Sequence, residues 1–328
     1  MRTDGTRSAP TGSRAEGCSR ALIRAFGVGL QPGASVSFAD LSSDDRFFGF
    51  AGAAVTAGWM ATDEDGSFRP DDPITTRELH RAIVVATGFG DLAASADALH
   101  MSDGTPITTP KDFGTLLIGM RIGLRYNHEH ESLDVGPDDP LSRAEVAWPL
   151  FRAATLPPRL HDSLSSYAAM TLPNFTPKMQ HVVSFAARYV GYPYVSGGEW
   201  NEPTSSAYCC GHQPVGGFDC SGLVWWVLKR AVPGWDPTPP RDYAGWDLPQ
   251  RTSASMAEAG KRVRWADLRP GDLLFYDAND NGSVDHVDMF IGDGWAIDSG
   301  GSNAGVTLTF VWGTWYQDHF VRARRVMD

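Results

Sequence analysis

One ten-residue pattern occurs twice in the first half of the 328-residue chain, and it limits the possible folds more than any other feature. Residues 70–79 read P-D-D-P-I-T-T-R-E-L and residues 137–146 read P-D-D-P-L-S-R-A-E-V, 67 residues apart. Each copy places a hydroxyl residue, Thr75 or Ser142, three residues before a Glu and ahead of an amphipathic segment. This spacing is typical of a capping box, in which the hydroxyl and the carboxylate bind backbone amides at a helix start. The pattern therefore predicts two equivalent helices.

A third, partial copy lies at the N-terminus. Residues 13–27 place Ser13 and Glu16 in the same cap positions, and an amphipathic segment follows. The upstream half of this unit is missing, whereas residues 45–60 supply an upstream helix for the next one. A self-similar period of this kind predicts a helical array. Residues 1–20 contain no apolar export signal, so we expect the natural start to lie upstream, within the array.

The repeats resemble the S-layer homology family. The matching stretches are F-A-D-L at 38–41, A-G-W-M at 57–60, D-G-S-F-R-P-D at 65–71 and I-T-T-R-E at 74–78. The resemblance implies an all-α helical-repeat domain over residues 1–155, which binds anionic cell-wall polymers non-covalently. Its expected units are a partial repeat at 1–37 and repeats at about 38–98 and 99–155. A helical array that serves only for spacing or dimerisation is the alternative.

Two further segments of the first half are informative. Residues 156–178 hold four prolines and little periodicity, so we place a Pro-rich linker at 156–174. The H-E-H-E stretch at 128–131 would align two histidines only on a strand. A solvated loop is the favoured interpretation, because the ligand set falls short of a metal site.

Charge and composition exclude two classes of protein. The chain has 28 Lys and Arg against 39 Asp and Glu, a net charge of −11, so it lacks the cationic surface that nucleic acid needs. It has no run of 18 apolar residues, so no transmembrane helix is expected. The four cysteines are too few for a disulfide scaffold and lack C-x-x-C spacing, so a reactive thiol must be identified from its surroundings.

Cys220 has the surroundings of a nucleophile. The stretch F-D-C-S-G at 218–222 precedes an apolar segment that predicts a buried helix, with Asp219 as its N-cap. Cys220 would then lie at the helix N-terminus, where the free amides and the helix dipole favour the thiolate. The alternative is a small buried apolar residue, which is the commonest role of a free cysteine.

A thiol nucleophile needs a base, and the base needs an orienting group. Residues 286–300 predict a hairpin in which His286 starts the first strand and Asp298 ends the second. A three-residue loop at 292–294 would pair 291 with 295 and 288 with 298, so that His286 and Asp298 share a face. A two-residue loop would place them on opposite faces.

The second half resembles the NlpC-type cell-wall cysteine peptidases over residues 175–328. The matching stretches are P-Y-V-S-G-G at 193–198, F-D-C-S-G at 218–222, R-P-G-D-L-L-F-Y at 269–276, H-V-D-M-F-I-G-D-G at 286–294 and H-F-V-R-A-R-R-V at 319–326. The resemblance implies an α+β, papain-like domain in which a helix bearing the cysteine packs on an antiparallel sheet. The whole chain would thus be α+β, with the helical repeats first.

The resemblance also implies a role for individual residues. Cys220 would be the nucleophile, His286 the general base and then acid, and Asp298 the third, orienting residue. Tyr194 would place its hydroxyl near the thiol and the oxyanion. The family uses the residues flanking the cysteine to hold a free amino end of the substrate, which here implies Asp219 and Ser221.

This chain departs from the family pattern at two positions. The third residue is more often His, Asn or Gln, and Asp298 in its place should raise the pKa of His286. The residue two after the histidine is usually Gly and is Asp288 here. A solvated strand position is the favoured interpretation of Asp288, and selection of a cationic substrate group is the alternative.

Three other clusters have competing interpretations. Asp277, Asn279, Asn281, Gly282 and Asp288 match a calcium-loop spacing, although a polar hairpin turn is favoured. Cys209, Cys210 and His212 are expected in a loop at the cleft mouth, and a disulfide to Cys18 is the alternative. The tryptophans that could line a sugar groove are expected mainly in the core; they are Trp200, Trp225, Trp226, Trp295 and Trp315.

The combined hypothesis is a secreted, wall-anchored cysteine endopeptidase that needs no metal or cofactor. Its substrate would be the peptidoglycan stem peptide, cut at the γ-D-glutamyl to diamino-acid bond, and its second partner an anionic wall polymer. We expect it outside the cell, associated with the wall. The alternatives are a catalytically inactive wall-binding protein and a papain-like amidase or acyltransferase that uses the same thiol.

Overall fold

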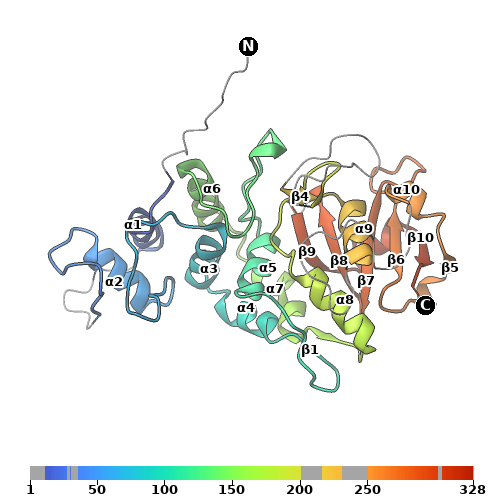
Figure 1. Ribbon diagram of the computed structural model, residues 1–328, viewed down its shortest axis with the longest axis horizontal. Coiled ribbons are helices and arrows are strands. Elements are labelled where there is room, and N and C mark those ends of the chain that lie inside the picture. The colour runs from blue at the N-terminus through green and yellow to red at the C-terminus, as the bar shows by residue number, and fades with distance from the viewer. Residues whose placement is uncertain are drawn as a thin grey trace, which may run out of the picture.

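The computed structural model describes residues 12–27, 30, 36–200, 216–230, 250–301 and 305–327. Helices form the first half and lie at one end of the molecule, while a sheet with two covering helices lies at the other (Figure 1). The helices of the first half are α1 (Ala15–Phe26), α2 (Phe48–Thr56), α3 (Thr76–Ala86), α4 (Gly90–Asp97), α5 (Phe113–Arg121) and α6 (Arg143–Ala154).

Two of the three predicted caps are confirmed. Thr75 caps α3 and Ser142 caps α6, and in each case the hydroxyl accepts from the N3 amide while the Glu carboxylate accepts from the cap amide. The Ser13 cap is wrong, because α1 starts after Arg14 and has no side-chain cap. The first unit is therefore shifted by one residue relative to the sequence alignment.

A ring of three backbone hydrogen bonds explains this shift. The amide of Ser13 donates to Leu141, the amide of Leu141 donates to Ile74, and the amide of Ile74 donates to Ser13, at 2.8, 2.9 and 2.8 Å. Ile74 and Leu141 each precede a cap residue, so Ser13 occupies their position and Arg14 that of the cap. The ring joins the N-terminal ends of α1, α3 and α6, which pack against one another. The three copies thus form one closed unit.

The segment predicted as a linker contains packed elements. It holds α7 (Leu160–Ser163), a 3₁₀ turn (Ser165–Ala169) and strand β2 (Thr171–Leu172), which pairs with β1 (His100–Met101). Tyr167 of the 3₁₀ turn is buried, and its hydroxyl donates to the carbonyl of Leu308 at 2.7 Å. The segment therefore connects both halves through a shared core. Because β1 lies within the first 155 residues, that part is not purely helical.

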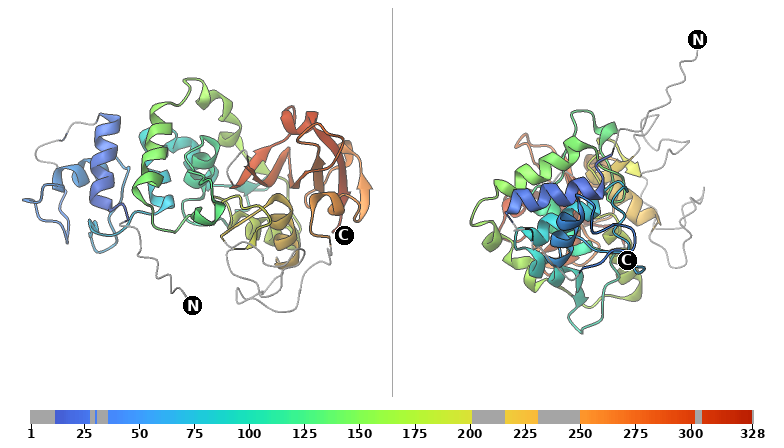
Figure 2. Two further views of the ribbon diagram at one scale, coloured as in Figure 1. Left: turned by 90° about the horizontal axis from the view of Figure 1, so that it is seen from above. Right: turned by 90° about the vertical axis from the view of Figure 1, so that its left-hand side faces the viewer.

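The second half is a two-layer α+β unit. An antiparallel sheet of six strands runs in the order β5-β10-β6-β7-β8-β9, and α8 and α9 pack together beside it. Seen from above, the sheet again lies at the opposite end from the N-terminal helices (Figure 2, left). The elements are α8 (Pro177–Ala187), β3 (Glu199–Trp200), β4 (Gly217–Phe218), α9 (Cys220–Arg230), α10 (Ser253–Met256), β5 (Lys261–Val263), a 3₁₀ turn (Trp265–Asp267), β6 (Leu273–Tyr276), β7 (His286–Gly292), β8 (Trp295–Gly300), β9 (Gly305–Phe310), α11 (Trp315–Asp318) and β10 (Phe320–Arg325).

Alternation along the strands separates two apolar layers. Odd-numbered residues of β7 and β8, such as Met289 and Ile297, join the large core with α8 and α9. Even-numbered residues, such as Phe290 and Ala296, join a smaller cluster with Tyr276 on the other face. Trp225 and Trp226 of α9 are buried as expected, as is Trp295. Among the described helices, none is both long and apolar enough to cross a membrane.

Candidate active site

The predicted nucleophile, Cys220, is the first residue of α9 and is 7% exposed. Asp219 caps the helix as predicted, because its carboxylate accepts from the amide of Gly222 at 2.5 Å and from the hydroxyl of Ser221 at 3.0 Å. Gly222 is required by close packing, since a Cβ there would lie 2.0 Å from the carbonyl oxygen of Gly198. The F-D-C-S-G stretch thus holds the helix end, with its dipole, against the turn at 193–198.

The hairpin that carries His286 has a two-residue loop, Asp293-Gly294, so the three-residue loop is wrong. Phe290 pairs with Ala296 and Gly292 with Trp295, which leaves Ile291 as a bulge. The bulge adds one residue to β7. With a two-residue loop alone His286 and Asp298 would lie on opposite faces, and the extra residue returns them to the same face. Asp288 therefore stands opposite Asp298, as predicted, but through a different local structure.

His286 and Asp298 do meet. The distance from His286 Nε2 to Asp298 Oδ1 is 2.9 Å, and the carboxylate is completely buried. Tyr316 of α11 donates its hydroxyl to the other oxygen of Asp298 at 3.2 Å. Because Nε2 faces the carboxylate, Nδ1 is the ring nitrogen available to exchange a proton with a thiol.

Asp288 is not solvated, which corrects the favoured interpretation from the sequence. It is 0% exposed, and its Oδ1 lies 3.0 Å from His286 Nε2. The reason is geometric, since residues two apart on a strand share a face and Asp288 faces Asp298 across the hairpin. These separations are hydrogen-bonding distances, and the ligand-type atoms of the three residues lie within 4.8 Å of one another. The cluster thus consists of two buried carboxylates that face one nitrogen of the His286 imidazole.

The charges of this cluster shift its pKa values in opposite directions. Burial lowers the pKa of His286, but attraction to Asp298 and Asp288 outweighs it and holds the pKa well above its usual value. Burial raises the pKa of Asp288, which next to Asp298 reaches about 7. Burial also acts to raise the pKa of Asp298, yet the imidazolium of His286 lowers it overall. Of the two carboxyl groups, Asp298 is thus the one that ionises more readily.

Tyr194 lies in the same site. Burial raises the pKa of its hydroxyl to about 12, with further contributions from Cys220 and Asp219 that raise it and one from His286 that lowers it. Cys220 and His286 therefore both lie within electrostatic reach of one phenol. Of the predicted residues, His286 and Asp298 are therefore in contact, and Tyr194 lies within electrostatic reach of Cys220 and His286.

Arg251 organises the helix end and was not identified from the sequence. Its guanidinium contacts Glu199 at 2.5 Å, both oxygens of Asp219 at 3.0 and 3.1 Å, and the Ser221 hydroxyl at 2.8 Å. It is 5% exposed. Ser221 donates to Asp219 and accepts from Arg251, so both residues expected to bind a substrate amine already have internal partners. The signal in the sequence was a lone Arg before a capped turn, Thr252 to Ser255, which does not specify a partner.

One contact brings the first half to this site. Glu131 accepts a hydrogen bond from the backbone amide of Ser196 at 2.8 Å and adds to the upward shift of the pKa of Tyr194. In the same loop, His128 contacts Asp134 at 3.0 Å and Glu145 at 3.4 Å. The H-E-H-E stretch is therefore an irregular segment fixed by carboxylates, not a strand.

The structure also places the residues with calcium-loop spacing and the cysteine Cys18. Asp277 accepts from the amides of Asn281 and Gly282 at 2.9 and 2.6 Å, which makes 277–282 a self-bonded turn, while Asp288 faces His286. The five residues with calcium-loop spacing thus do not face one point. Cys209, Cys210 and His212 lie outside the described residues. Cys18 is buried in α1 with a free thiol, and burial raises its pKa to about 12.

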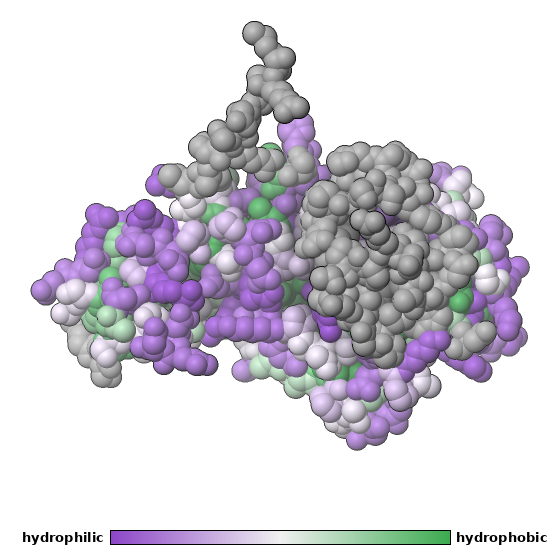
Figure 3. Space-filling model, viewed as in Figure 1, coloured by the Kyte–Doolittle hydropathy of each residue, from purple (hydrophilic) through white to green (hydrophobic). Residues whose placement is uncertain are grey.

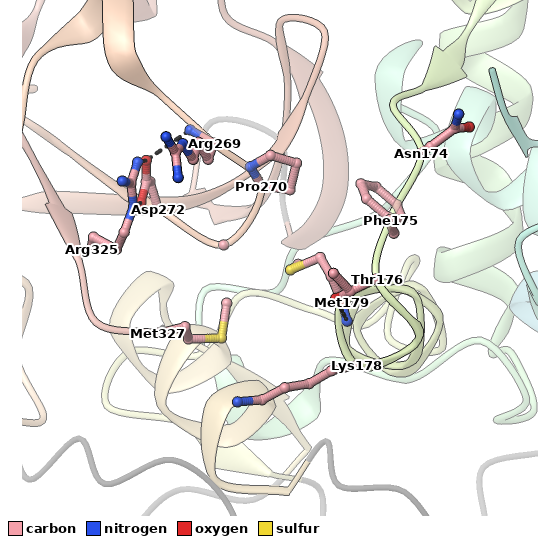
Figure 4. A pocket seen from close by; sticks show the side chains of 11 residues that line it. Asn174, Phe175, Thr176, Lys178, Met179, Arg269, Pro270, Asp272, Arg325 and Met327 are labelled. Carbon is pink, nitrogen blue, oxygen red and sulfur yellow. Dashed lines mark hydrogen bonds and ion pairs between the residues drawn. The ribbon is translucent and has the colours of Figure 1, made fainter.

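Two cavities lie away from Cys220. The first, of about 280 Å³, is formed by the start of α8, the turn before β6 and the C-terminal residues (Figure 4). In it Arg325 pairs with Asp272 at 2.7 Å, and Met179 and Met327 form an apolar wall. The second, of about 700 Å³, lies among the repeats and is lined by 20 residues that include Arg69, Arg77, Arg81 and Lys111.

Comparison with known proteins agrees with this architecture. Residues 191–325 match the model of the NlpC/P60 family, and residues 37–76 match that of the S-layer homology domain. The chain is 28% identical over 261 residues to peptidoglycan endopeptidase RipB of Mycobacterium tuberculosis, covering 79% of this chain and 86% of that protein. It is 31% identical over 140 residues to the probable endopeptidase YafL of Escherichia coli, covering 42% and 46%.

Among solved structures, an NlpC/P60 family protein from Bacillus cereus aligns with 26% identity and a TM-score of 0.36, covering 47% of this chain and 42% of the other. The chain spans less than half the length of the first curated relatives it matches. The two family matches fall on the two parts that the sequence and the structure distinguish. The chain therefore carries an S-layer homology domain in its first half and an NlpC/P60 domain in its second.

Proposed function

We propose that this chain is a peptidoglycan hydrolase, a cysteine endopeptidase that cleaves the stem peptide at the γ-D-glutamyl to diamino-acid bond. The single observation that carries the proposal is the buried His286–Asp298 pair, which shares the neighbour Tyr194 with the helix-terminal thiol of Cys220. The names of the relatives, which are endopeptidases of peptidoglycan, support the substrate class. In this proposal residues 1–155 form the repeats, residues 156–174 connect the two parts, and residues 175–328 form the catalytic domain.

The chemistry follows from the geometry. His286 accepts the Cys220 proton on Nδ1, and the thiolate attacks the amide carbonyl to form a tetrahedral intermediate. The imidazolium then donates that proton to the leaving amine, and water activated by the same imidazole hydrolyses the thioester. Asp298 fixes the tautomer and stabilises the cation, while the Cys220 amide and the Tyr194 hydroxyl bind the oxyanion.

The contacts of Asp219 affect how it could bind a free amine of the substrate. Its two oxygens already bind Arg251, so a free amine of the substrate would have to share this carboxylate with a guanidinium. Shared binding weakens any requirement for a free amino end. We therefore favour an endopeptidase that accepts intact stem peptides, with Asp219 and Ser221 positioning the helix end as well as the substrate.

The test uses soluble muropeptides and mass spectrometry of the products. Wild-type protein should release a fragment with a new amine at the diamino acid, and Cys220→Ala should bind the muropeptides without cutting them. Cys18→Ala is the matched control, because it removes a thiol that is buried far from the base, and it should retain activity. Binding without turnover by the wild type would favour the alternative of an inactive wall-binding protein, whereas transfer to an added amine would favour an acyltransferase.

We further propose that the repeats attach the protein to the outside of the cell through an anionic wall polymer. The candidate site is the cavity among the repeats, where four cationic side chains lie beside the Thr75 capping box. Five carboxylates also line it, so the polymer would have to contact the cations directly; they are Asp63, Asp72, Glu78, Asp112 and Asp138. The face of the repeats seen in Figure 3 is mainly hydrophilic, which suits a polar ligand. Arg69 and Arg77 pair with Asp63 and Asp138, which also line the cavity, so the positions of their guanidinium groups are fixed.

Co-sedimentation with purified walls tests the attachment. Arg81→Gln should weaken binding, and added salt should weaken it further, because charge attraction is screened. Arg188→Gln, an exposed Arg outside the cavity, is the control. Equal sedimentation of both variants with the wild type at all salt concentrations would contradict the assignment of this cavity.

A further inference from the structure

The second carboxylate on the imidazole, Asp288, lacks a role in the reaction described above. It lies two residues after His286 on β7 and opposite Asp298 of β8, and all three side chains point to the same face. Both carboxylates are 0% exposed, and their Oδ1 atoms lie 3.0 and 2.9 Å from the same Nε2 atom. One N–H group therefore faces two acids.

Two ionised carboxylates against one imidazolium would leave a net negative charge in a buried site. Such a charge is costly unless hydrogen bonds or a counter-charge compensate it. Among the described residues, neither oxygen of Asp288 accepts a hydrogen bond of regular geometry, although His286 Nε2 lies 3.0 Å from its Oδ1. A proton on Asp288 removes both problems, because the residue becomes neutral and can itself donate to Asp298.

The groups around the pair permit this arrangement. Tyr276 faces Asp288 from β6 and Tyr316 faces Asp298 from α11. Tyr194 lies within electrostatic reach of both His286 and Cys220. The guanidinium of Arg121, from α5, acts on the Tyr316 hydroxyl and reaches Thr309 of β9 at 3.5 Å. Asp298 already receives the Tyr316 hydroxyl, so it is the better anion and Asp288 the better proton carrier.

We propose that Asp288 is a positioning residue: it holds His286 Nε2 together with Asp298 and carries a proton that it donates to the Asp298 carboxylate. The upward shift of the Asp288 pKa and the downward shift of the Asp298 pKa agree with this distribution. The proposal rests on the assignment of His286 as the base. In this proposal Asp288 and Asp298 together, and not Asp298 alone, orient the imidazole ring of His286.

The protonation state of Asp288 determines how strongly the His286 imidazolium holds its proton. With Asp288 neutral, the imidazolium faces one full anion and can release its proton to the leaving amine. When Asp288 ionises, a second anion stabilises the imidazolium, which becomes a weaker acid. Ionisation of Asp288 should therefore slow the acid step and alter the reactivity of the thiol in the same pH range.

The test compares the pH dependence of Cys220 alkylation by iodoacetamide in full-length wild type and Asp288→Asn. Asparagine mimics the protonated acid in shape and charge but cannot ionise. The wild-type profile should contain an inflection near neutral pH, and Asp288→Asn should lose it. Asp293→Asn is the matched control, because it makes the same change at the exposed turn of the same hairpin, and it should keep the inflection.

Superimposable profiles for wild type and Asp288→Asn would overturn the proposal. If the asparagine variant does not fold, Asp288→Ser gives the same comparison with a smaller neutral group. Turnover of muropeptides is measured in parallel, and kcat of Asp288→Asn should exceed that of the wild type on the alkaline side. Loss of the inflection without any muropeptide cleavage would reject the proposed function while leaving the proton-sharing pair in place.

Discussion

The guanidinium of Arg251 binds both carboxylate oxygens of Asp219, at 3.0 and 3.1 Å, one residue before the thiol. The same group binds Glu199, so one cation serves two acids at the start of α9. Burial acts to lower the pKa of Arg251, but the attraction of Asp219 and Glu199 outweighs it. The orientation of the helix that carries Cys220 thus depends on a residue 31 positions further along the chain.

Arg251→Met should destabilise the protein strongly. It keeps the length of the side chain but leaves Asp219 and Glu199 without their cation, and loss of one partner of a buried pair costs about 3–5 kcal/mol. The midpoint of urea unfolding, followed by tryptophan fluorescence, measures the effect. Arg264→Met is the control, since Arg264 pairs with Asp267 in solvent, and it should not change the midpoint. Equal midpoints for both variants would show that the Arg251 contacts are not stabilising.

The two described cysteines should differ sharply in reactivity. Cys18 is 1% exposed and burial raises its pKa to about 12, so its thiolate is scarce at neutral pH. Iodoacetamide should therefore modify Cys220 in the native protein and Cys18 only after denaturation. Peptide mass spectrometry of the two samples reads this out. Modification of Cys18 at the native-state rate of Cys220 would contradict the packing of α1.

The capping boxes should each contribute measurably to stability. Replacing a capping hydroxyl by Ala costs about 1 kcal/mol, so Thr75→Ala and Ser142→Ala should both lower the free energy of unfolding. Ser13→Ala is the matched control, because Ser13 enters the three-membered ring only through its backbone. It should have no effect. If Ser13→Ala lowered the free energy of unfolding as much as the other two variants, Ser13 would be a capping residue, as the sequence suggested.

The predictions that succeeded depend on local patterns. The caps at Thr75 and Ser142 and the helix start at Asp219 each lie within four residues of their partners, so the sequence specifies them. Those that failed depend on distant contacts. Ser13 is displaced from its cap position by bonds to Ile74 and Leu141, which only the folded array supplies.

The candidate site shows the same division. The hairpin of His286 and Asp298 follows from alternation, but the bulge at Ile291 cannot be read from a period of two. Asp288 was expected in solvent because its sequence position does not reveal what covers it. The cover includes Tyr276 of the neighbouring strand β6 and Tyr316 of α11, which lies 28 positions further along the chain than Asp288.

The contribution of Asp288 to the stability of the protein should fall as pH rises from acid to neutral. Its pKa is near 3.9 in the unfolded chain and about 7 in the folded one, so the folded state alone binds this proton between those values. Because the native state then binds more protons than the unfolded state, stability decreases with pH across this window. Asp288→Asn removes the ionisable group, so the variant should gain stability relative to wild type between pH 4 and pH 7, and the gain should level off above pH 7. Thermal unfolding midpoints of the two proteins across pH 4–8 measure it, and a constant difference would contradict a buried, proton-carrying Asp288.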